Sequence, residues 1–538
     1  MNHLLKSLTK YEKWVFLLIV LVNLLPVFSY RFFPTLDGPA HLYNANLINQ
    51  LLFAPHSNLD SFLQFNSEAV PNWTGHALLC FFKWFLPGYL AEKMVLILYF
   101  VGLPYSFRYL AKSINPEYIG LSYLIFPFTY NYLLALGFYN FSFGLIGLLL
   151  ILTYWIKNHQ TIASSVKKIL ILSLFLTVTY FSHIVMFSIG LLAVSCYTFI
   201  TFLKQLFETK NIREALISHF KKALVLLISS FIPLVLMILY FTNRPDSGNA
   251  VFLPKDELIK WINYLNPVIC YNEEVESAFT RKVIYILYAL IIGGIIVRIR
   301  NRKSVNEING KSGMLRLNDI WLLITGIMLL LLFIMPDENG MASIISMRFG
   351  LLFFLFLIIW ISSMKQIKWF VLVCSALLLI VHFKRVHYLD SIIEIHNKIA
   401  INCNKAERFI KPNSVIAPVN LTNNWFVAHF PNYLGIDKPM VILENYEAAM
   451  NYFPLLWKTK SLPNLEIGGE SIAEYSLFSS NPTNLKNGKK EVDYIFVLGK
   501  WDSLNADHNN TLRMISTSFV QAYKNENCTL YRHKKLQD

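Results

Sequence analysis

Long apolar runs separated by short polar segments recur along most of this chain. Many of the runs approach the roughly 20 residues that an α-helix needs to cross a bilayer. They predict about eleven spans, at residues 14–30, 89–107, 118–136, 139–156, 168–182, 184–203, 222–242, 282–297, 319–335, 347–363 and 367–384. The pattern is typical of an α-helical polytopic membrane protein.

Two stretches have lengths that do not fit one span. At about 1.5 Å per residue, 168–203 would far exceed a hydrocarbon core of roughly 30 Å, so we divide it at Ser182-His183. Two full spans between 73 and 107 would invert every later loop against the charge pattern. We therefore expect 73–86, ended by Pro87-Gly88, to form a re-entrant or interfacial helix.

Lysine and arginine clusters lie in alternate loops, which sets the predicted orientation. The loops 31–88, 244–281 and 336–346 carry mixed or net acidic charge and are expected outside. An odd number of spans then places the N-terminus in the cytoplasm and the C-terminal region outside it. The chain is expected to be a multi-pass protein of the inner, cytoplasmic membrane.

The composition becomes polar after Lys384. We expect residues 1–384 to form the transmembrane domain and 385–538 a small extracytoplasmic α/β domain, since about 150 residues can build their own core. Predicted strands are 414–419, 440–444, 492–498, 519–523 and 528–532, the last two paired around Asn525-Glu526-Asn527. Nothing in the spacing of this region demands chemistry, so it is expected to act as a lid or scaffold.

The chain is 55% hydrophobic and has a net charge of +15. Because most of the basic residues lie in short loops between spans, no nucleic acid is expected as a partner. The six cysteines show neither CxxC nor zinc-type spacing. Cys403 and Cys528 could pair if the C-terminal region is extracytoplasmic.

The polar pattern directly after the first span indicates chemistry. Asp37 precedes His41 by four residues, which places both side chains on one helix face at the water boundary. This is a favourable place for a general base. The alternative is that Asp37 only caps a helix. The helix expected at 40–53 has an apolar stripe and should lie along the membrane surface.

Four further polar residues lie at the outer ends of predicted spans: Asn140, His183, Glu338 and Arg348. Ionisable groups near the membrane interior are costly and often functional, so we expect one site open to the outside. Structural alternatives stay open for each of them: turn hydrogen bonds, a packing histidine, a solvated loop and a snorkelling arginine. His76 is expected to be structural.

The chemistry that uses such a set is transfer from a lipid-linked phosphate donor. A carboxylate deprotonates an acceptor hydroxyl, while an arginine and a histidine hold the phosphate. We therefore predict catalytic roles for Asp37 and His41, and donor-phosphate or substrate contacts for the other four residues. No GxGxxG after a strand and no GxxxxGK[ST] nucleotide motif is present.

An acidic motif after the first span, helices in the first outer loop, about eleven spans and an outer C-terminal domain resemble the GT-C glycosyltransferase superfamily. Bacterial protein mannosyltransferases and aminoarabinose transferases are members. The resemblance implies a polyprenyl-phosphate-linked sugar donor, a base or metal-ligand role for Asp37, and a donor-phosphate role for Arg348. The chain departs from the family because Asp37 has no adjacent second acid and 130–140 contains no carboxylate.

Those departures leave no assigned metal ligand, although a divalent cation stays open as a cofactor. The predicted function is transfer of a sugar to an acceptor hydroxyl of a lipid, glycan or protein at the extracytoplasmic face. The expected partners are the lipid-linked sugar, membrane lipids and an unidentified acceptor. The alternatives are a lipid-linked polysaccharide polymerase or ligase, and a transporter or scaffold without catalysis.

Overall fold

The computed structural model describes residues 2–54, 57–68, 70–209, 212–243, 249–309, 317–340, 342–458, 492–501, 512–513 and 515–536. Its residues form two compact units. The membrane unit comprises 1–24, 98–135 and 140–389, and the loop unit comprises 25–97, 136–139 and 390–538. The loop unit contains the first outer loop together with the C-terminal region from 390, and the domain boundary at 384 stays a prediction.

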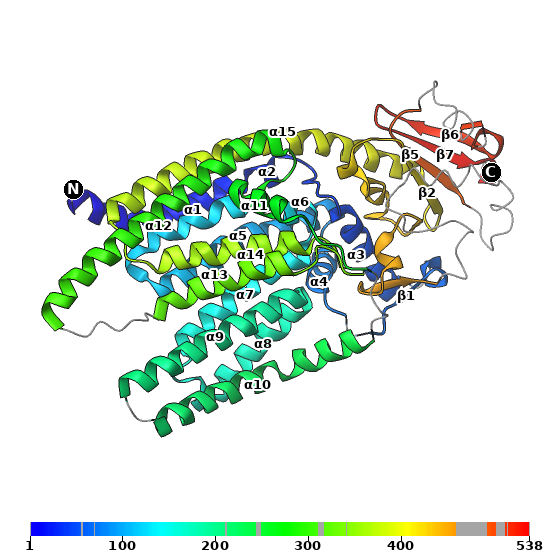
Figure 1. The fold of residues 1–538 in the computed structure, drawn as a ribbon. Coiled ribbons are helices and arrows are strands. Elements are labelled where there is room, and N and C mark those ends of the chain that lie inside the picture. The colour runs from blue at the N-terminus through cyan, green and yellow to red at the C-terminus, as the bar shows by residue number, and fades with distance from the viewer. Residues whose placement is uncertain are drawn as a thin grey trace. The chain divides into compact units, whose positions relative to one another are not determined.

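Helices make up the membrane unit, and each is drawn in Figure 1. They are α1 (Asn2–Asn23), α5 (Gly88–Ile114), η2 (Pro116–Phe128), α6 (Tyr132–Ala135), α7 (Tyr139–Asn158), η3 (Ile162–Ser164), α8 (Val166–Ser182), α9 (Ile184–Thr209), α10 (Ile212–Thr242), α11 (Lys255–Tyr264), η4 (Asn266–Val268), α12 (Glu273–Asn309), η5 (Leu317–Asp319), α13 (Ile320–Ile334), α14 (Ile345–Ser363) and α15 (Lys368–Lys405). The helices α5, α7 and α15 also contribute residues to the loop unit.

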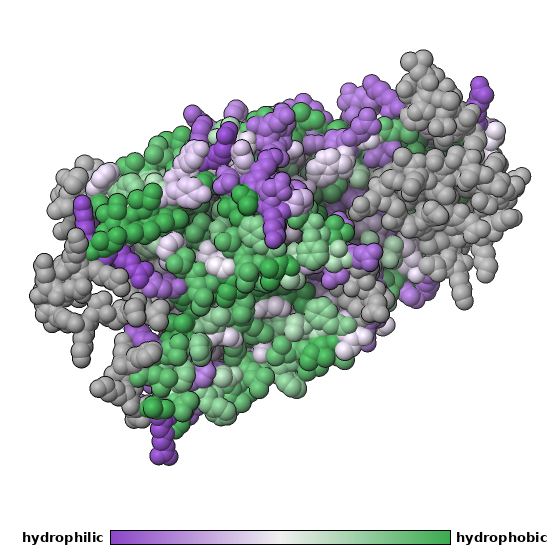
Figure 2. Space-filling model, in the orientation of Figure 1, coloured by the Kyte–Doolittle hydropathy of each residue, from purple (hydrophilic) through white to green (hydrophobic). Residues whose placement is uncertain are grey.

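Among the described residues, seven helices are long and apolar enough to cross a membrane: α5, α7, α9, α10, α12, α14 and α15. Leu227, Phe231 and Ile238 on α10 are exposed, and Figure 2 shows hydrophobic side chains gathered where Figure 1 draws α8, α9 and α10. Apolar residues facing outward from long helices fit contact with lipid rather than water. The protein is an α-helical, multi-pass membrane protein.

Every predicted span except one falls on α-helices, although 14–30 is divided between α1 and α2. The exception is 118–136, where the chain forms the 3₁₀ helix η2 and then the four-residue α6. Pro127 lacks a backbone N–H and interrupts this stretch, which explains why apolar composition alone was misleading. The segment predicted at 73–86 contains α4 (Thr74–Lys83), whose ten residues reach about 15 Å and cannot span the bilayer.

The loop unit combines short helices with two sheets. Its remaining elements are α2 (Leu25–Ser29), α3 (Gly38–Phe53), η1 (Asn58–Ser61), β1 (Leu63–Phe65), η6 (Ala406–Phe409), β2 (Val415–Asn420), η7 (Trp425–Val427), η8 (Phe430–Gly435), β3 (Val441–Ile442), η9 (Tyr446–Ala449), β4 (Leu455–Trp457), β5 (Tyr494–Leu498), β6 (Phe519–Lys524), β7 (Cys528–His533) and η12 (Lys534–Leu536).

The larger sheet has the order β3-β2-β5-β7-β6. The strand β2 is parallel to β3 and β5, whereas β7 is antiparallel to β5 and β6. Every residue of β5 is buried, as expected for a central strand that reads Tyr-Ile-Phe-Val-Leu. All five predicted strands are present, so the small α/β region of the predicted fold class is confirmed.

The helix α3 begins two residues before the expected start at 40. It runs from Gly38 to Phe53, with Pro39 in its first turn, and all residues from Gly38 to Ile48 are buried. Asn44 exchanges side-chain hydrogen bonds of 2.9 Å with Asn445, and Asn46 donates to the carbonyl of Gly435 at 2.8 Å. These amides have protein partners, so the polar positions of the helix are packed within the loop unit, and its place along the membrane surface stays a prediction.

Candidate functional site

The backbone holds Asp37 at the start of α3. Asp37 occupies the N-cap position, but its side chain makes no capping hydrogen bond, so the carboxylate is free for other partners. Its N–H donates to the carbonyl of Leu136 at 3.0 Å. The adjacent Gly137 has φ +86°, and a Cβ there would lie 2.7 Å from the Gly38 nitrogen. Glycine is therefore required for this close approach.

The Asp37 carboxylate lies between a tyrosine and a histidine of the C-terminal region. Tyr446 donates its hydroxyl hydrogen to Asp37, and Nε2 of His429 lies 3.6 Å from Oδ1 of Asp37. The Asp37 side chain is only 13% exposed. Burial raises the pKa of Asp37, although the neighbouring His429 and His41 oppose this shift. The carboxylate is thus a stronger proton acceptor than one in water.

A second carboxylate fixes His429. Its Nδ1 hydrogen-bonds to Oε1 of Glu444, whose other oxygen accepts from Nδ2 of Asn432 at 2.5 Å. Burial alone would lower the pKa of His429, but the charge and hydrogen bond of Glu444 raise it to about 9. His429 is therefore an imidazolium at neutral pH. A hydrogen-bonded cation is held beside Asp37, with the Tyr446 ring 4.6 Å from the His429 ring.

His41 lies one helical turn after Asp37 and points to another carboxylate. Its Nδ1 lies 2.5 Å from Oε1 of Glu447, and Nε2 of His76 lies 2.8 Å from Oε2 of the same residue. Burial would raise the pKa of Glu447, but the two imidazoles lower it to about 2. Glu447 is therefore ionised, and it joins α3 and α4 to η9.

Polar contacts also fix the loop before Asp37. The hydroxyls of Thr35 and Tyr139 lie 3.1 Å apart, and the Tyr139 hydroxyl donates to Oε1 of Glu92 at 2.9 Å. Thr35 also accepts from the Gly38 N–H at 3.1 Å. A Cβ on Gly38 would lie 2.3 to 2.7 Å from oxygen atoms of these three side chains. The absence of a side chain at Gly38 lets this network close around the loop.

Of the six predicted site residues, Asp37 and His41 lie together in the loop unit. The other four belong to the membrane unit. There, Nδ1 of His183 accepts from the backbone of Val185 at 3.3 Å, which is the structural role left open for it. Glu338 is exposed, and its backbone forms an isolated antiparallel β-bridge with Val251. Asn140 is buried near the start of α7, and Arg348 lies in the first turn of α14.

The C-terminal residues around Asp37 could not be predicted from the sequence. His429, Glu444, Tyr446 and Glu447 come from a region that we expected to be a scaffold, and His76 contacts Glu447 rather than only packing. The run Glu444-Asn445-Tyr446-Glu447 after a strand was the available signal. It was uninformative alone because its partners lie about 400 residues earlier in the chain.

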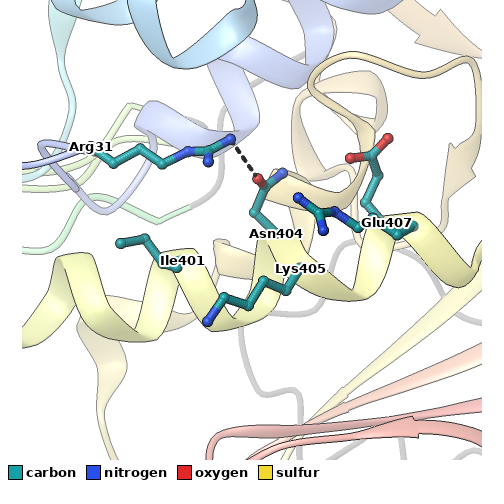
Figure 3. A pocket seen from close by; sticks show the side chains of 6 residues that line it. Arg31, Ile401, Asn404, Lys405 and Glu407 are labelled. Carbon is teal, nitrogen blue, oxygen red and sulfur yellow. Dashed lines mark hydrogen bonds between the residues drawn. The ribbon is translucent and has the colours of Figure 1, made fainter.

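The loop unit also contains a shallow pocket beside the end of α15. It is lined by Arg31, Ile401, Asn404, Lys405, Glu407 and Arg408. Figure 3 shows Arg31 reaching toward Asn404, and Nη2 of Arg31 donates to Oδ1 of Asn404 at 3.4 Å. Arg31, Lys405 and Arg408 are exposed, and none of the lining residues belongs to the clusters around Asp37 and Glu447.

Comparison with known proteins yields one structural similarity. No model of a protein family matches the sequence, and no curated protein matches it. The chain is similar to the crystal structure of ArnT from Cupriavidus metallidurans in the apo state, with 11% sequence identity and a TM-score of 0.40. The match covers 97% of this chain and 98% of that chain. At this identity and TM-score, the likeness assigns neither an activity nor residue roles.

Proposed function

We propose that this protein is a membrane glycosyltransferase that moves a sugar from a polyprenyl-phosphate-linked donor to an acceptor hydroxyl. The observation that carries the proposal is the buried Asp37 carboxylate, which has a tyrosine hydroxyl and an imidazolium beside it. A carboxylate with a raised pKa in a multi-pass membrane protein suits proton abstraction from a substrate that arrives on a lipid.

In the proposed reaction, Asp37 accepts the proton of the acceptor hydroxyl. The acceptor oxygen forms a bond to the anomeric carbon of the sugar as the bond from that carbon to the phosphate oxygen breaks. The phosphate leaves with the electron pair and stays on the lipid. The proton on Asp37 is afterwards lost to water, which restores the carboxylate.

Neighbouring residues position this base. Tyr446 donates a hydrogen bond to Asp37, which leaves the remaining lone pairs of the carboxylate for the acceptor. The His429 imidazolium offsets the charge of Asp37, so the carboxylate can stay ionised while it is buried. The donor-phosphate role of Arg348 remains a hypothesis from the sequence resemblance. The substrate contacts of His183, Asn140 and Glu338 remain a hypothesis from their positions at the outer ends of predicted spans.

Several features support this proposal over the alternatives weighed from the sequence. The clustered groups are a base with positioning partners, whereas a transporter needs a polar path near the bilayer midplane. A scaffold would have no need of a buried carboxylate whose pKa is raised, because such a group costs stability. We further propose that transfer takes place at the extracytoplasmic face, and the proposal covers any sugar and any acceptor that carries a hydroxyl.

The test replaces Asp37 by asparagine, which keeps the shape and removes the base. Membranes with wild-type protein or Asp37→Asn receive polyprenyl-phosphate donors that carry different radiolabelled sugars, and the loss of label from the donor itself, separated from other lipids by chromatography, is measured. We expect a decrease of about 10²- to 10⁴-fold, the usual contribution of general-base catalysis. The exposed Asp60→Asn is the matched control and should retain wild-type transfer. Transfer by Asp37→Asn at the wild-type rate would show that the base lies elsewhere.

A further inference from the structure

Glu447 lies between two buried imidazoles that the proposed proton transfer does not use directly. The side chains of His41, His76 and Glu447 are 5%, 0% and 1% exposed. One ligand atom from each lies within 4.8 Å of the other two. The His41 and His76 rings are 5.1 Å apart, and Phe453 packs against both of them. Three groups that bind metals therefore converge in a dry setting.

The second ring nitrogen of His41 and of His76 has a backbone partner, as is usual for metal-binding histidines. His41 also hydrogen-bonds to the backbone of Gly137, and Nδ1 of His76 lies 3.4 Å from the Asn72 carbonyl oxygen. A ring that donates one N–H to a carbonyl oxygen presents a lone pair on its other nitrogen. Metal-binding histidines almost always have such an outer hydrogen bond, which fixes the tautomer and the ring orientation.

We infer that His41, His76 and Glu447 bind one divalent transition-metal ion, with Zn²⁺ as the best match. Two imidazole nitrogens and one carboxylate form a common three-ligand zinc set that leaves a fourth position for water or another ligand. Mg²⁺ and Ca²⁺ prefer a shell of oxygen atoms, which this cluster does not supply. These three residues are far apart in the sequence and form no acidic pair or cysteine motif, so local spacing does not indicate a metal site.

The three side chains must rearrange to accept the ion. Zinc ligands lie about 2.0–2.2 Å from the metal, which places ligand atoms of a tetrahedral site roughly 3.4 Å apart. The present separations are 2.5 Å for His41 to Glu447 and 2.8 Å for His76 to Glu447. Because the two imidazoles contact opposite oxygens of Glu447, side-chain rotations must lengthen both separations and also aim both rings at one metal position. A direct hydrogen-bonded network without metal is the competing arrangement, and the experiment distinguishes the two.

Such an ion would tie α3, α4 and η9 together, one helical turn from Asp37. The inference does not depend on the proposed transferase activity, because an ion at this place can hold the loop unit whatever reaction the protein performs. Its test accordingly measures metal, not sugar transfer.

Full-length protein without a polyhistidine tag is purified in detergent, equilibrated with micromolar Zn²⁺, passed over a desalting column and assayed for metal by mass spectrometry. We expect one zinc per chain in the wild type. His76→Ala and Glu447→Gln should each weaken Zn²⁺ binding by more than the about 10- to 100-fold that loss of an outer partner costs. The control His533→Gln, on β7, should keep the metal.

Wild-type protein without zinc, or variants that keep it at the wild-type stoichiometry, would overturn the inference. If both variants fail to fold, X-ray absorption of the zinc-loaded wild type decides. A shell with two imidazoles and no sulfur supports the site, and a thiolate shell or an all-oxygen shell refutes it. Failure of Asp37→Asn to affect transfer would leave these results unchanged, so the two proposals fail independently.

Discussion

At the residue scale, two histidine–carboxylate pairs flank Asp37 and influence it in opposite ways. The His429 imidazolium stabilises the Asp37 charge, whereas the Glu447 carboxylate destabilises it. Glu444 holds the proton on His429, so the nearest charge to Asp37 is positive at neutral pH. Asp37 can therefore be buried, ionised and still basic, which a lone carboxylate in the same place could not be.

This balance predicts a pH profile for sugar transfer. The pKa of His429 is about 9, above its ordinary value, so the cation is present below that pH and is lost as pH rises through it. Below that pH the cation lowers the pKa of Asp37, so the acidic limb of wild-type transfer should lie at lower pH than it would without the cation. His429→Gln removes the cation at every pH, which raises the pKa of Asp37 and moves the acidic limb to higher pH. A pH–rate profile of both proteins measures this, and an unshifted acidic limb in His429→Gln would contradict it.

The sequence predicted only part of this cluster. Asp37 and His41 could be identified because they are four residues apart on one predicted helix, so local spacing alone brings them together. His429, Tyr446 and Glu447 could not, because nothing in a single sequence pairs them with a segment about 400 residues away. The spacing of residues within one helix predicts which side chains lie close together, whereas contacts between distant segments depend on tertiary packing.

At the element scale, α3 shows the same limit. Its start could be predicted from Asp37-Gly38-Pro39 and from the apolar periodicity that follows. Its environment could not, because Asn44 and Asn46 look like positions on a solvated face. In the structure these amides hydrogen-bond to Asn445 and to backbone carbonyls, so burial costs them little.

Removal of one amide of the Asn44–Asn445 pair should be costly. In Asn44→Ala, the buried Asn445 loses both side-chain hydrogen bonds to Asn44, and an unsatisfied buried group costs about 1–3 kcal/mol. We expect a lower midpoint of thermal unfolding in detergent. The double variant Asn44→Ala/Asn445→Ala should be less destabilised than the sum of the single variants. Additive shifts would show that the two amides act independently.

A second element contact predicts a disulfide. Cys403 lies in the last turn of α15 and Cys528 begins β7, and their buried thiols hydrogen-bond to each other. If the C-terminal region is extracytoplasmic, these thiols should be oxidised in the protein isolated from cells. Mass spectrometry of peptides prepared without reductant, after blocking of free thiols, measures the pair. Two alkylated cysteines would indicate a reducing compartment and contradict the predicted orientation.

At the scale of the whole molecule, the positions of the long helices could be predicted because membrane thickness sets the length of a span. Runs of about 20 apolar residues matched long helices because the bilayer sets their length. The prediction was wrong at 118–136, where apolar composition does not distinguish an α-helix from the 3₁₀ helix η2. The fold class could thus be predicted from composition and run length. The association of the first outer loop with the C-terminal region within one unit could not, because it depends on contacts distant in sequence.

The orientation of the chain is the last prediction, and it determines which side Asp37 faces. Lys365 lies between α14 and α15 and Lys368 begins α15, and the excess of such residues in alternate loops predicts a cytoplasmic location for this segment. Alkaline phosphatase, which is active only outside the cytoplasm, should be inactive when fused after Gln366 and active when fused at the C-terminus. A fluorescent protein that matures only in the cytoplasm should give the reverse pattern at the same two places. If both reporters show the opposite result, the first outer loop faces the cytosol, and Asp37 cannot act on a donor at the extracytoplasmic face.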